Sequence, residues 1–308
     1  MARRLNPAAG LVALVALVAL AGSPVACAQS APPAPPAQSV QVPSLDAPRG
    51  TALVLPGHWF VATGPMQAPT LAPALVLMHG CGGPFDGRGQ LAARYTELAA
   101  RLNAMGVHAL VTDSFTPRGE KELCTQRVGS RQVTQLQRRR DALGALQWLA
   151  AQPGVDPKRL GLLGWSNGGS TVLSALNRRH PEVAAAPVQP SLAVAFYPGC
   201  ETELARGFEP TAPLLMLLGE LDDWTPASPC KALSHGAQTS PASPAVQWES
   251  YAGAYHGFDG TAAVRLRRDV PNGAHPGQGV HVGGDPVARA AAALRLTQFL
   301  QDTWNLKR

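Results

Sequence analysis

A serine at the centre of a Gly-x-Ser-x-Gly string is the residue of this sequence best placed to do chemistry. The string GWSNG covers residues 164–168 around Ser166, and an apolar run at 160–165 leads into it. A serine in this pattern stands on a sharp turn between a strand and a helix, and glycines nearby avoid a steric clash with its strained backbone. The turn lifts the hydroxyl to the carboxyl edge of the sheet, beside a helix N-terminus. The pattern therefore predicts a nucleophilic serine.

A histidine and an acid follow this serine in the order that such a nucleophile needs. A serine hydroxyl is weak at neutral pH, so a histidine must activate it and an acid must orient the histidine. Asp222 follows an apolar run at 213–218, and His256 follows another at 246–251. The order serine, acid, histidine is typical of a serine on a strand-to-helix turn. We expect His256 to take the proton of Ser166 and Asp222 to orient His256.

Nearby carboxylates compete with Asp222 for the role of the acid. Asp223 is its direct neighbour, and we expect Asp223 to cap the following turn or helix instead. Glu220 and Asp259 are weaker alternatives. The histidine has no such competitor, because among the eight histidines only His256 closely follows the last apolar run, where it is flanked by Gly253 and Gly257.

Two backbone N–H groups are needed to hold the negative oxygen that forms when a serine attacks a carbonyl. Asn167, the residue after the serine, supplies one. The glycine-rich string HGCGG at 79–83 ends an earlier apolar run, so the second donor is the N–H of Cys81 or, failing that, of Gly82. We expect His79 to hold this turn through a hydrogen bond. A nucleophilic Cys81 thiol is disfavoured, since no histidine follows in the expected order and a disulfide partner is available.

Short apolar runs alternate with longer amphipathic segments along most of the chain. The expected strands are 74–79, 107–112, 160–165, 192–197, 213–218 and 246–251. The expected helices are 90–105, 133–150, 169–177, 228–234 and 286–304. This alternation predicts an α/β fold, with a mostly parallel sheet covered by helices on both faces. Two connections, 113–129 and 259–284, are longer than the topology requires, and such loops often carry function.

The first 28 residues have the features of a signal peptide. Two arginines precede an apolar run at 11–21, and Ala26-Cys27-Ala28 forms a small-x-small cleavage site. Gly22, Ser23 and Pro24 interrupt the run before it is long enough for a membrane anchor, so we expect no stable membrane span. We therefore expect a periplasmic or secreted protein.

The segment after the signal peptide begins with a Pro/Ala-rich tract. We expect an extended leader over residues 29–40, without packed structure. A single domain then covers residues 41–308, because no repeat or change of composition marks a second one. A lipoprotein anchor at Cys27 is a minor alternative, since the residues before it fit that type of site poorly.

Removal of residues 1–28 leaves an even number of cysteines in a chain bound for an oxidising compartment. Two disulfides are therefore expected, with three possible pairings. We favour Cys81–Cys124 and Cys200–Cys230, because each pair lies at the ends of strands expected to be neighbours.

The basic residues do not indicate a nucleic-acid partner. The formal net charge is +6, and the basic residues are scattered apart from Arg138-Arg139-Arg140. This triplet falls in the expected helix 133–150, whose leucines recur at helical spacing. We expect the three arginines to form a solvated face of that helix.

The motifs together resemble the dienelactone hydrolase family of α/β hydrolases, over residues 74–304. The likeness rests on HGCGG at 79–83, GWSNGG at 164–169, GELD at 219–222 with Pro226, and YHGF at 255–258. It implies the α/β-hydrolase fold, favours Asp222 over Asp223 through the spacing to Pro226, and implies no metal or organic cofactor. The founding members carry a cysteine where this chain has Ser166, so the likeness does not extend to dienelactone as the substrate.

The expected activity is hydrolysis of a small-molecule carboxylic ester through an acyl-enzyme on Ser166. A peptidase or amidase would share the same three side chains, and a silent binding protein would share only the fold. Four aromatic residues, Phe115, Trp165, Trp224 and Tyr255, are candidates for an apolar acyl pocket or for ordinary core packing.

Overall fold

The computed structural model describes residues 1–2, 36–62, 71–237 and 243–306. The expected signal peptide beyond its first two residues, Cys27, and the leader up to residue 35 lie outside these ranges. The end of the expected leader is already part of the folded domain, because strand β1 begins at Gln38.

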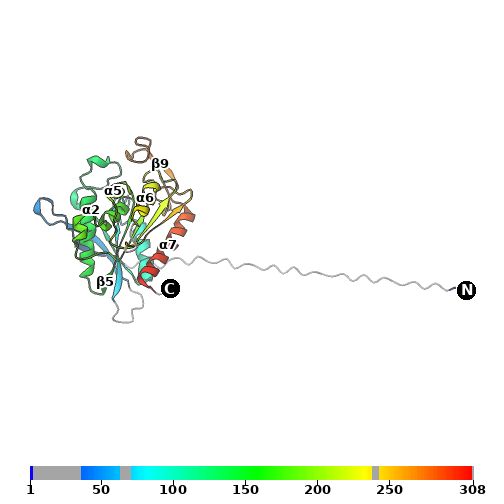
Figure 1. Cartoon of the computed structure of the whole chain (residues 1–308), viewed down its shortest axis with the longest axis horizontal. Coiled ribbons are helices and arrows are strands. Elements are labelled where there is room, and N and C mark those ends of the chain that lie inside the picture. The colour runs from blue at the N-terminus through cyan, green and yellow to red at the C-terminus, as the bar shows by residue number, and fades with distance from the viewer. Residues whose placement is uncertain (3–35, 63–70, 238–242, 307–308) are drawn as a thin grey trace. The chain divides into compact units, whose positions relative to one another are not determined.

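An eight-stranded sheet forms the centre of the domain (Figure 1). Its strands are β1 (Gln38–Pro43), β2 (Val54–Phe60), β3 (Ala72–Met78), β4 (His108–Thr112), β5 (Val155–Trp165), β6 (Leu192–Phe196), β7 (Leu214–Gly219) and β8 (Val246–Tyr251). The spatial order is β1-β2-β4-β3-β5-β6-β7-β8. Strands β3 to β8 pair in parallel, whereas β2 runs antiparallel to both β1 and β4.

The six strands predicted from apolar runs are all present, and β1 and β2 are the two that were missed. Their sequences do not form continuous apolar runs, because β2 contains Pro56 and Gly57 and has alternating exposed and buried residues. Alternation of this kind is typical of antiparallel strands near a sheet edge, whereas central parallel strands are buried on both faces. β3 and β7, for example, are buried along their whole length.

Helices cover both faces of the sheet. The helices are α1 (Ala93–Ala104), α2 (Gln135–Ala150), α3 (Asn167–Leu176), α4 (Pro181–Ala184), α5 (Glu201–Arg206), α6 (Ala227–Ala237) and α7 (Pro286–Trp304). Buried side chains of α2, α3 and α6 share one hydrophobic core with the sheet, and those of α1 and α7 share a second core. The domain is therefore the layered α/β structure that the alternation predicts. None of the helices within the described ranges is long and apolar enough to cross a membrane.

The arginine triplet on α2 does not form a solvated face, so that expectation was wrong for two of its members. Arg138 is 0% exposed and Arg139 is 7% exposed. Arg139 donates to Glu182 at 2.5 Å and to the Ser174 hydroxyl at 2.8 Å. Arg140 also pairs with Glu182 but keeps more contact with solvent. The helix packs against both the sheet and its neighbour α3, so it buries a wider arc than its leucines alone indicate.

Both long connections lie at the carboxyl ends of the parallel strands, because one follows β4 and the other follows β8. The first contains only short 3₁₀ turns, at Thr116–Arg118 and Val128–Ser130. The second folds into a hairpin of β9 (Arg265–Arg267) and β10 (Val280–Val282). Figure 1 shows both segments projecting at the same end of the domain.

The two favoured cysteine pairs are both bonded. Cys81–Cys124 joins the turn after β3 to the connection after β4. Cys200–Cys230 joins the segment after β6 to helix α6. The pairing prediction is therefore confirmed, and each bridge ties down a segment at the carboxyl edge of the sheet.

Candidate active site

Ser166 stands on a tight turn between β5 and α3, with a positive φ of 54°. The turn requires glycine on either side. A Cβ on Gly164 would lie 2.2 Å from the carbonyl oxygen of Gly168, and one on Gly168 would lie 2.1 Å from that of Met78. Because real Cβ atoms do not approach a carbonyl so closely, the two glycines allow the backbone conformation that raises Ser166 above the sheet.

A chain of two hydrogen bonds links the serine, the histidine and the acid. Nε2 of His256 lies 2.8 Å from Ser166 Oγ, and Nδ1 lies 2.8 Å from Asp222 Oδ2. All three residues are at least nine-tenths buried. A carboxylate only accepts, so Nδ1–H donates to Asp222 and leaves Nε2 free to accept the serine proton. This arrangement can activate the hydroxyl as a nucleophile.

Asp222 and Asp223 point in different directions. Oδ1 of Asp222 accepts from the backbone N–H groups of Trp224 and Thr225, at 2.9 and 2.8 Å. Asp223 instead accepts from the backbone N–H and Nδ1 of His281, at 2.8 and 2.7 Å. The expected capping role of Asp223 was therefore wrong, because Asp222 itself holds the turn and Asp223 anchors strand β10.

The other two carboxylates that were weighed lie away from His256. Glu220 accepts from the Ser250 hydroxyl on an exposed part of the surface, at 3.1 Å. Asp259 accepts from Trp165 and Tyr197 instead. Neither carboxylate is hydrogen-bonded to the histidine.

The imidazole of His256 packs against two aromatic rings. The ring centroids of Tyr197 and Trp224 lie 4.6 and 4.7 Å from that of His256. Tyr197 has a positive φ of 37°, and its carbonyl accepts from the Thr225 hydroxyl at 2.9 Å. The carbonyl of His256 accepts from Gly283 N–H at 3.0 Å, which joins the histidine to the segment after β10. These contacts restrict rotation of the imidazole.

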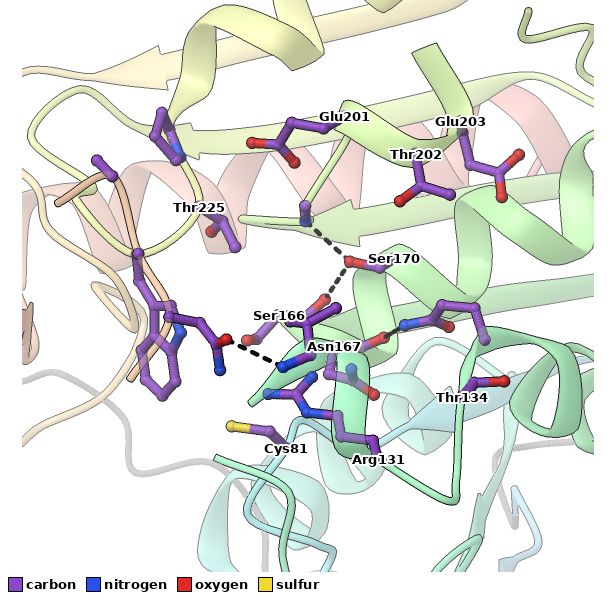
Figure 2. Close-up of a pocket in the computed structure, with 18 of the residues that line it drawn as sticks. Cys81, Arg131, Thr134, Ser166, Asn167, Ser170, Glu201, Thr202, Glu203 and Thr225 are labelled. Atoms are coloured by element: carbon purple, nitrogen blue, oxygen red, sulfur yellow. Dashed lines mark hydrogen bonds between the residues drawn. The ribbon is translucent and has the colours of Figure 1, made fainter. Parts of the chain in front are cut away.

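The two expected N–H donors lie next to Ser166. Cys81 and Asn167 line the same cavity as the serine (Figure 2). Asn167 is the first residue of α3, so its N–H has no acceptor within the helix. The N–H of Cys81 donates none of the backbone hydrogen bonds found among the described residues. Both groups are therefore available to a ligand oxygen.

His79 is buried and holds the turn before Cys81, as expected. Its Nδ1 lies 2.8 Å from the carbonyl of Gly80, and its Nε2 accepts from Ser114 N–H at 3.2 Å. Burial lowers the pKa of His79 well below its ordinary value, and the nearby Arg138 cation lowers it further. A neutral imidazole with a proton on Nδ1 satisfies both bonds.

Arg138 is a residue of the site that the sequence analysis missed. Its guanidinium donates to Asn167 Oδ1 at 2.5 Å and to the carbonyl of His79 at 2.7 Å. Burial lowers the pKa of Arg138 to about 10. A signal was present in the sequence, because Arg138 shares a helical face with the buried Ala142 and Ala145.

The cavity beside Ser166 has a volume of about 440 Å³, and both polar and apolar side chains line it. Of the four aromatic residues considered, only Trp224 lines it. Trp165 packs in the core, Phe115 packs against the ring of His79, and Tyr255 packs against His281. Of the two alternatives, packing therefore applies to these three residues, and only Trp224 remains a candidate for an acyl pocket.

The polar side chains that line the cavity come from several elements. Figure 2 shows Arg131 and Thr134 on one side of the cavity and Glu201 and Thr202 on the other. Among the described residues, no three His, Cys, Asp or Glu side chains are grouped so that they could hold a metal ion.

Known structures share this fold at low sequence identity. Esterase 2 of Thermogutta terrifontis, phosphorylated by paraoxon, matches with a TM-score of 0.60 and 19% identity, over 90% of this chain and 98% of that chain. A dienelactone hydrolase-like promiscuous phosphotriesterase from metagenomic libraries matches with a TM-score of 0.59 and 19% identity, over 87% and 99%. A comparison with curated proteins found no match.

The family is shown by a family model rather than by these structures. The model of the dienelactone hydrolase family matches residues 61–303, which is most of the chain. That range includes the strand-to-helix turn at Ser166 and the glycine-rich turn at Cys81. The chain therefore belongs to the dienelactone hydrolase family, and it is a carboxylic-ester hydrolase of the α/β-hydrolase fold.

Proposed function

We propose that the chain cleaves small carboxylic esters through an acyl-enzyme on Ser166. Ser166 Oγ attacks the ester carbonyl carbon while its proton passes to Nε2 of His256. Asp222 keeps the imidazole oriented and stabilises the positive charge that it acquires. The carbonyl oxygen becomes an oxyanion, which accepts hydrogen bonds from the N–H groups of Cys81 and Asn167.

The same groups then complete the reaction. The bond between the carbonyl carbon and the alcohol oxygen breaks, and the alcohol leaves with the proton from His256. A water molecule attacks the acyl group on Ser166 and gives a proton to His256. That proton returns to Ser166 Oγ as the carboxylic acid is released.

The observation that carries this proposal is the buried chain of two 2.8 Å hydrogen bonds from Ser166 through His256 to Asp222. A strained serine backbone and two available N–H groups accompany it. A silent binding protein would have no need of this combination. The cavity volume of about 440 Å³ is within the range of small-molecule sites.

Export belongs to the same proposal. Two disulfides are compatible with a location outside the cytoplasm. We infer that residues 1–28 are a signal peptide and that the mature domain acts in the periplasm or outside the cell.

The decisive experiment uses the purified mature protein with p-nitrophenyl acetate and butyrate, beside Ser166→Ala and Ser130→Ala. Ser130 is an exposed serine whose hydroxyl bonds only to the carbonyl of Arg127. We expect turnover by the wild type and by Ser130→Ala, and none by Ser166→Ala. Turnover that persists in Ser166→Ala would exclude this nucleophile.

Paraoxon provides an independent probe of the nucleophile. We expect one phosphoryl group per wild-type chain, found by mass spectrometry on the peptide that contains Ser166, and none on Ser166→Ala. A wild-type protein that takes up no label and hydrolyses no ester would favour a silent binding protein. Hydrolysis of p-nitroanilides at rates similar to those for p-nitrophenyl esters would favour an amidase.

A further inference from the structure

Arg138 occupies an unusual position for an arginine. It lies on α2 and is 0% exposed, which places it among the largest fully buried side chains of the described residues. Its guanidinium lies 5.2 Å from the ring centroid of Phe115. Burial of a charged side chain costs free energy unless other groups compensate for it.

The two acceptors of Arg138 belong to the two segments that carry the proposed oxyanion donors. One terminal nitrogen donates to the side chain of Asn167, whose own N–H is the first donor. The other donates to the carbonyl of His79, two residues before Cys81, whose N–H is the second donor. The planar guanidinium therefore holds both segments at once, with the fixed geometry that arginine provides.

The charge of Arg138 has no carboxylate partner among the ion pairs of the described residues. The carboxylate that acts most strongly on it is that of Asp141. Both oxygens of Asp141 already accept from Arg118, at 2.8 and 2.9 Å, and one also accepts from Ser44. Nε of Arg138 has no hydrogen-bond partner either. A positive charge thus lies behind the oxyanion donors without a direct negative partner.

We propose that Arg138 is a positioning residue for ester hydrolysis. It holds both oxyanion donors in place, and its buried charge stabilises the oxyanion more than the neutral ester. The inference rests on the proposed function. A fixed charge that becomes compensated only as negative charge develops lowers the energy of the transition state more than that of the bound ester. Its loss therefore lowers kcat more than it raises KM.

The test compares three variants with the wild type. Arg138→Met removes both the charge and the hydrogen bonds, and Arg138→Lys keeps the charge without the two-pronged geometry. Arg139→Met is the matched control, since Arg139 is a buried arginine on the same helix that bonds to Glu182 and Ser174 instead. We expect kcat for p-nitrophenyl acetate to fall about 10- to 100-fold in Arg138→Met and less in Arg138→Lys. KM should change less than threefold, and Arg139→Met should keep the wild-type kcat even if its melting temperature falls.

A boronic acid separates a role in the transition state from a general structural role. Butylboronic acid forms a tetrahedral, negatively charged adduct with an active serine, so its affinity reports stabilisation of the oxyanion. We expect its Ki to rise in the Arg138 variants by the same factor as kcat/KM falls, and to stay unchanged in Arg139→Met. An unchanged kcat in Arg138→Met, or a lower kcat with an unchanged boronate Ki, would overturn the inference.

A further variant keeps the test valid if Arg138→Met does not fold. Asn167→Ala removes one acceptor of Arg138 but leaves the backbone N–H in place. It should lower kcat about 3- to 10-fold and weaken boronate binding to the same extent, and wild-type values would again overturn the inference. A wild-type protein without esterase activity or paraoxon labelling would refute the proposed function, whereas an active wild type with equally active Arg138 variants would refute only the role of Arg138.

Discussion

The indole N–H of Trp165 donates a 2.8 Å hydrogen bond to the carboxylate of Asp259. Trp165 lies one residue before the proposed nucleophile, and Asp259 lies three residues after the proposed base. The other oxygen of Asp259 accepts from the Tyr197 hydroxyl at 2.6 Å, and Arg94 donates to that hydroxyl at 2.8 Å. Burial, and then the charge of Asp259, raise the pKa of Tyr197 well above its ordinary value, so the phenol stays protonated. One carboxylate thus joins the segments that carry the nucleophile and the base.

Replacement of Asp259 by asparagine should therefore loosen both segments. An amide offers only one oxygen acceptor to two donors and leaves Arg94 without its carboxylate. We expect the free energy of unfolding to fall by about 2–4 kcal/mol and kcat to fall several-fold, measured by urea denaturation and ester hydrolysis. Asp269→Asn is the control, because its carboxylate is 56% exposed and pairs only with Arg267. If the two variants were equally stable, the hydrogen bonds of Asp259 would not contribute to stability.

Substitutions of the two adjacent aspartates should have very different effects on kcat. Asp222→Asn removes the carboxylate that orients His256, and we expect kcat to fall by roughly 10³- to 10⁴-fold. Asp223→Asn should change kcat by less than about tenfold, because this side chain holds His281 on strand β10. Steady-state kinetics on both variants decide the assignment, and a larger loss in Asp223→Asn would reverse it.

The two disulfides should contribute similarly to stability but differently to kcat. Each closes a long loop, with sequence separations of 43 and 30 residues, so replacement of either pair by serine should cost about 2–4 kcal/mol of stability. Only Cys81–Cys124 holds a proposed oxyanion donor. We expect kcat to fall in the variant that lacks this bridge and to stay near the wild-type value in the variant that lacks Cys200–Cys230. Equal kcat values at a temperature where both variants are folded would contradict this.

Stability should decrease at mildly acidic pH because of His79. Its pKa is well below the ordinary value of 6.5 in the folded protein, so the unfolded chain binds a proton that the folded state excludes. The stabilisation is present above pH 6.5 and is lost as the pH falls below it. We expect the free energy of unfolding to be lower at pH 5 than at pH 7, with a contribution from this residue of at most about 2 kcal/mol.

Urea denaturation at several pH values tests this expectation. His79→Asn should reduce the change in the free energy of unfolding between pH 5 and 7. Part of the remaining pH dependence should come from His58 and His108, since burial lowers their pKa values too. His275→Asn, at an exposed position, is the control and should keep the wild-type slope. An unchanged slope in His79→Asn would show that another group is responsible.

Gly168→Ala should disrupt the turn that carries the serine. Its Cβ would lie 2.1 Å from the carbonyl of Met78 and 2.6 Å from that of His79, so the strand or the helix must move. We expect a loss of about 3 kcal/mol or more in stability, together with loss of activity. The same change at Gly236 in α6, where a Cβ meets nothing within 4 Å, should raise stability by about 0.5–1 kcal/mol. Thermal melting of both variants would show whether glycine 168 is required.

Local patterns in the sequence determined much of the architecture. The apolar runs predicted the six central parallel strands, because such strands are buried on both faces and need no alternation. The strand-to-helix turn at Ser166 was predictable because the turn requires glycines for steric reasons, and these glycines lie within two residues of the serine. The order of Asp222 and His256 after their strands was predictive because the ends of parallel strands meet at one edge of the sheet. The disulfide pairs followed from the same reasoning.

Only the tertiary structure decided which side chains face one another across that edge. Arg138 looked like part of a solvated triplet, and its burial depends on how α2 packs against the sheet and α3. The roles of Asp223 and Asp259 depend on the paths of the long connection and of β10, which local propensity does not specify. Contacts of this kind join residues far apart in the chain, so their energies arise only when the helices and loops have packed on the sheet.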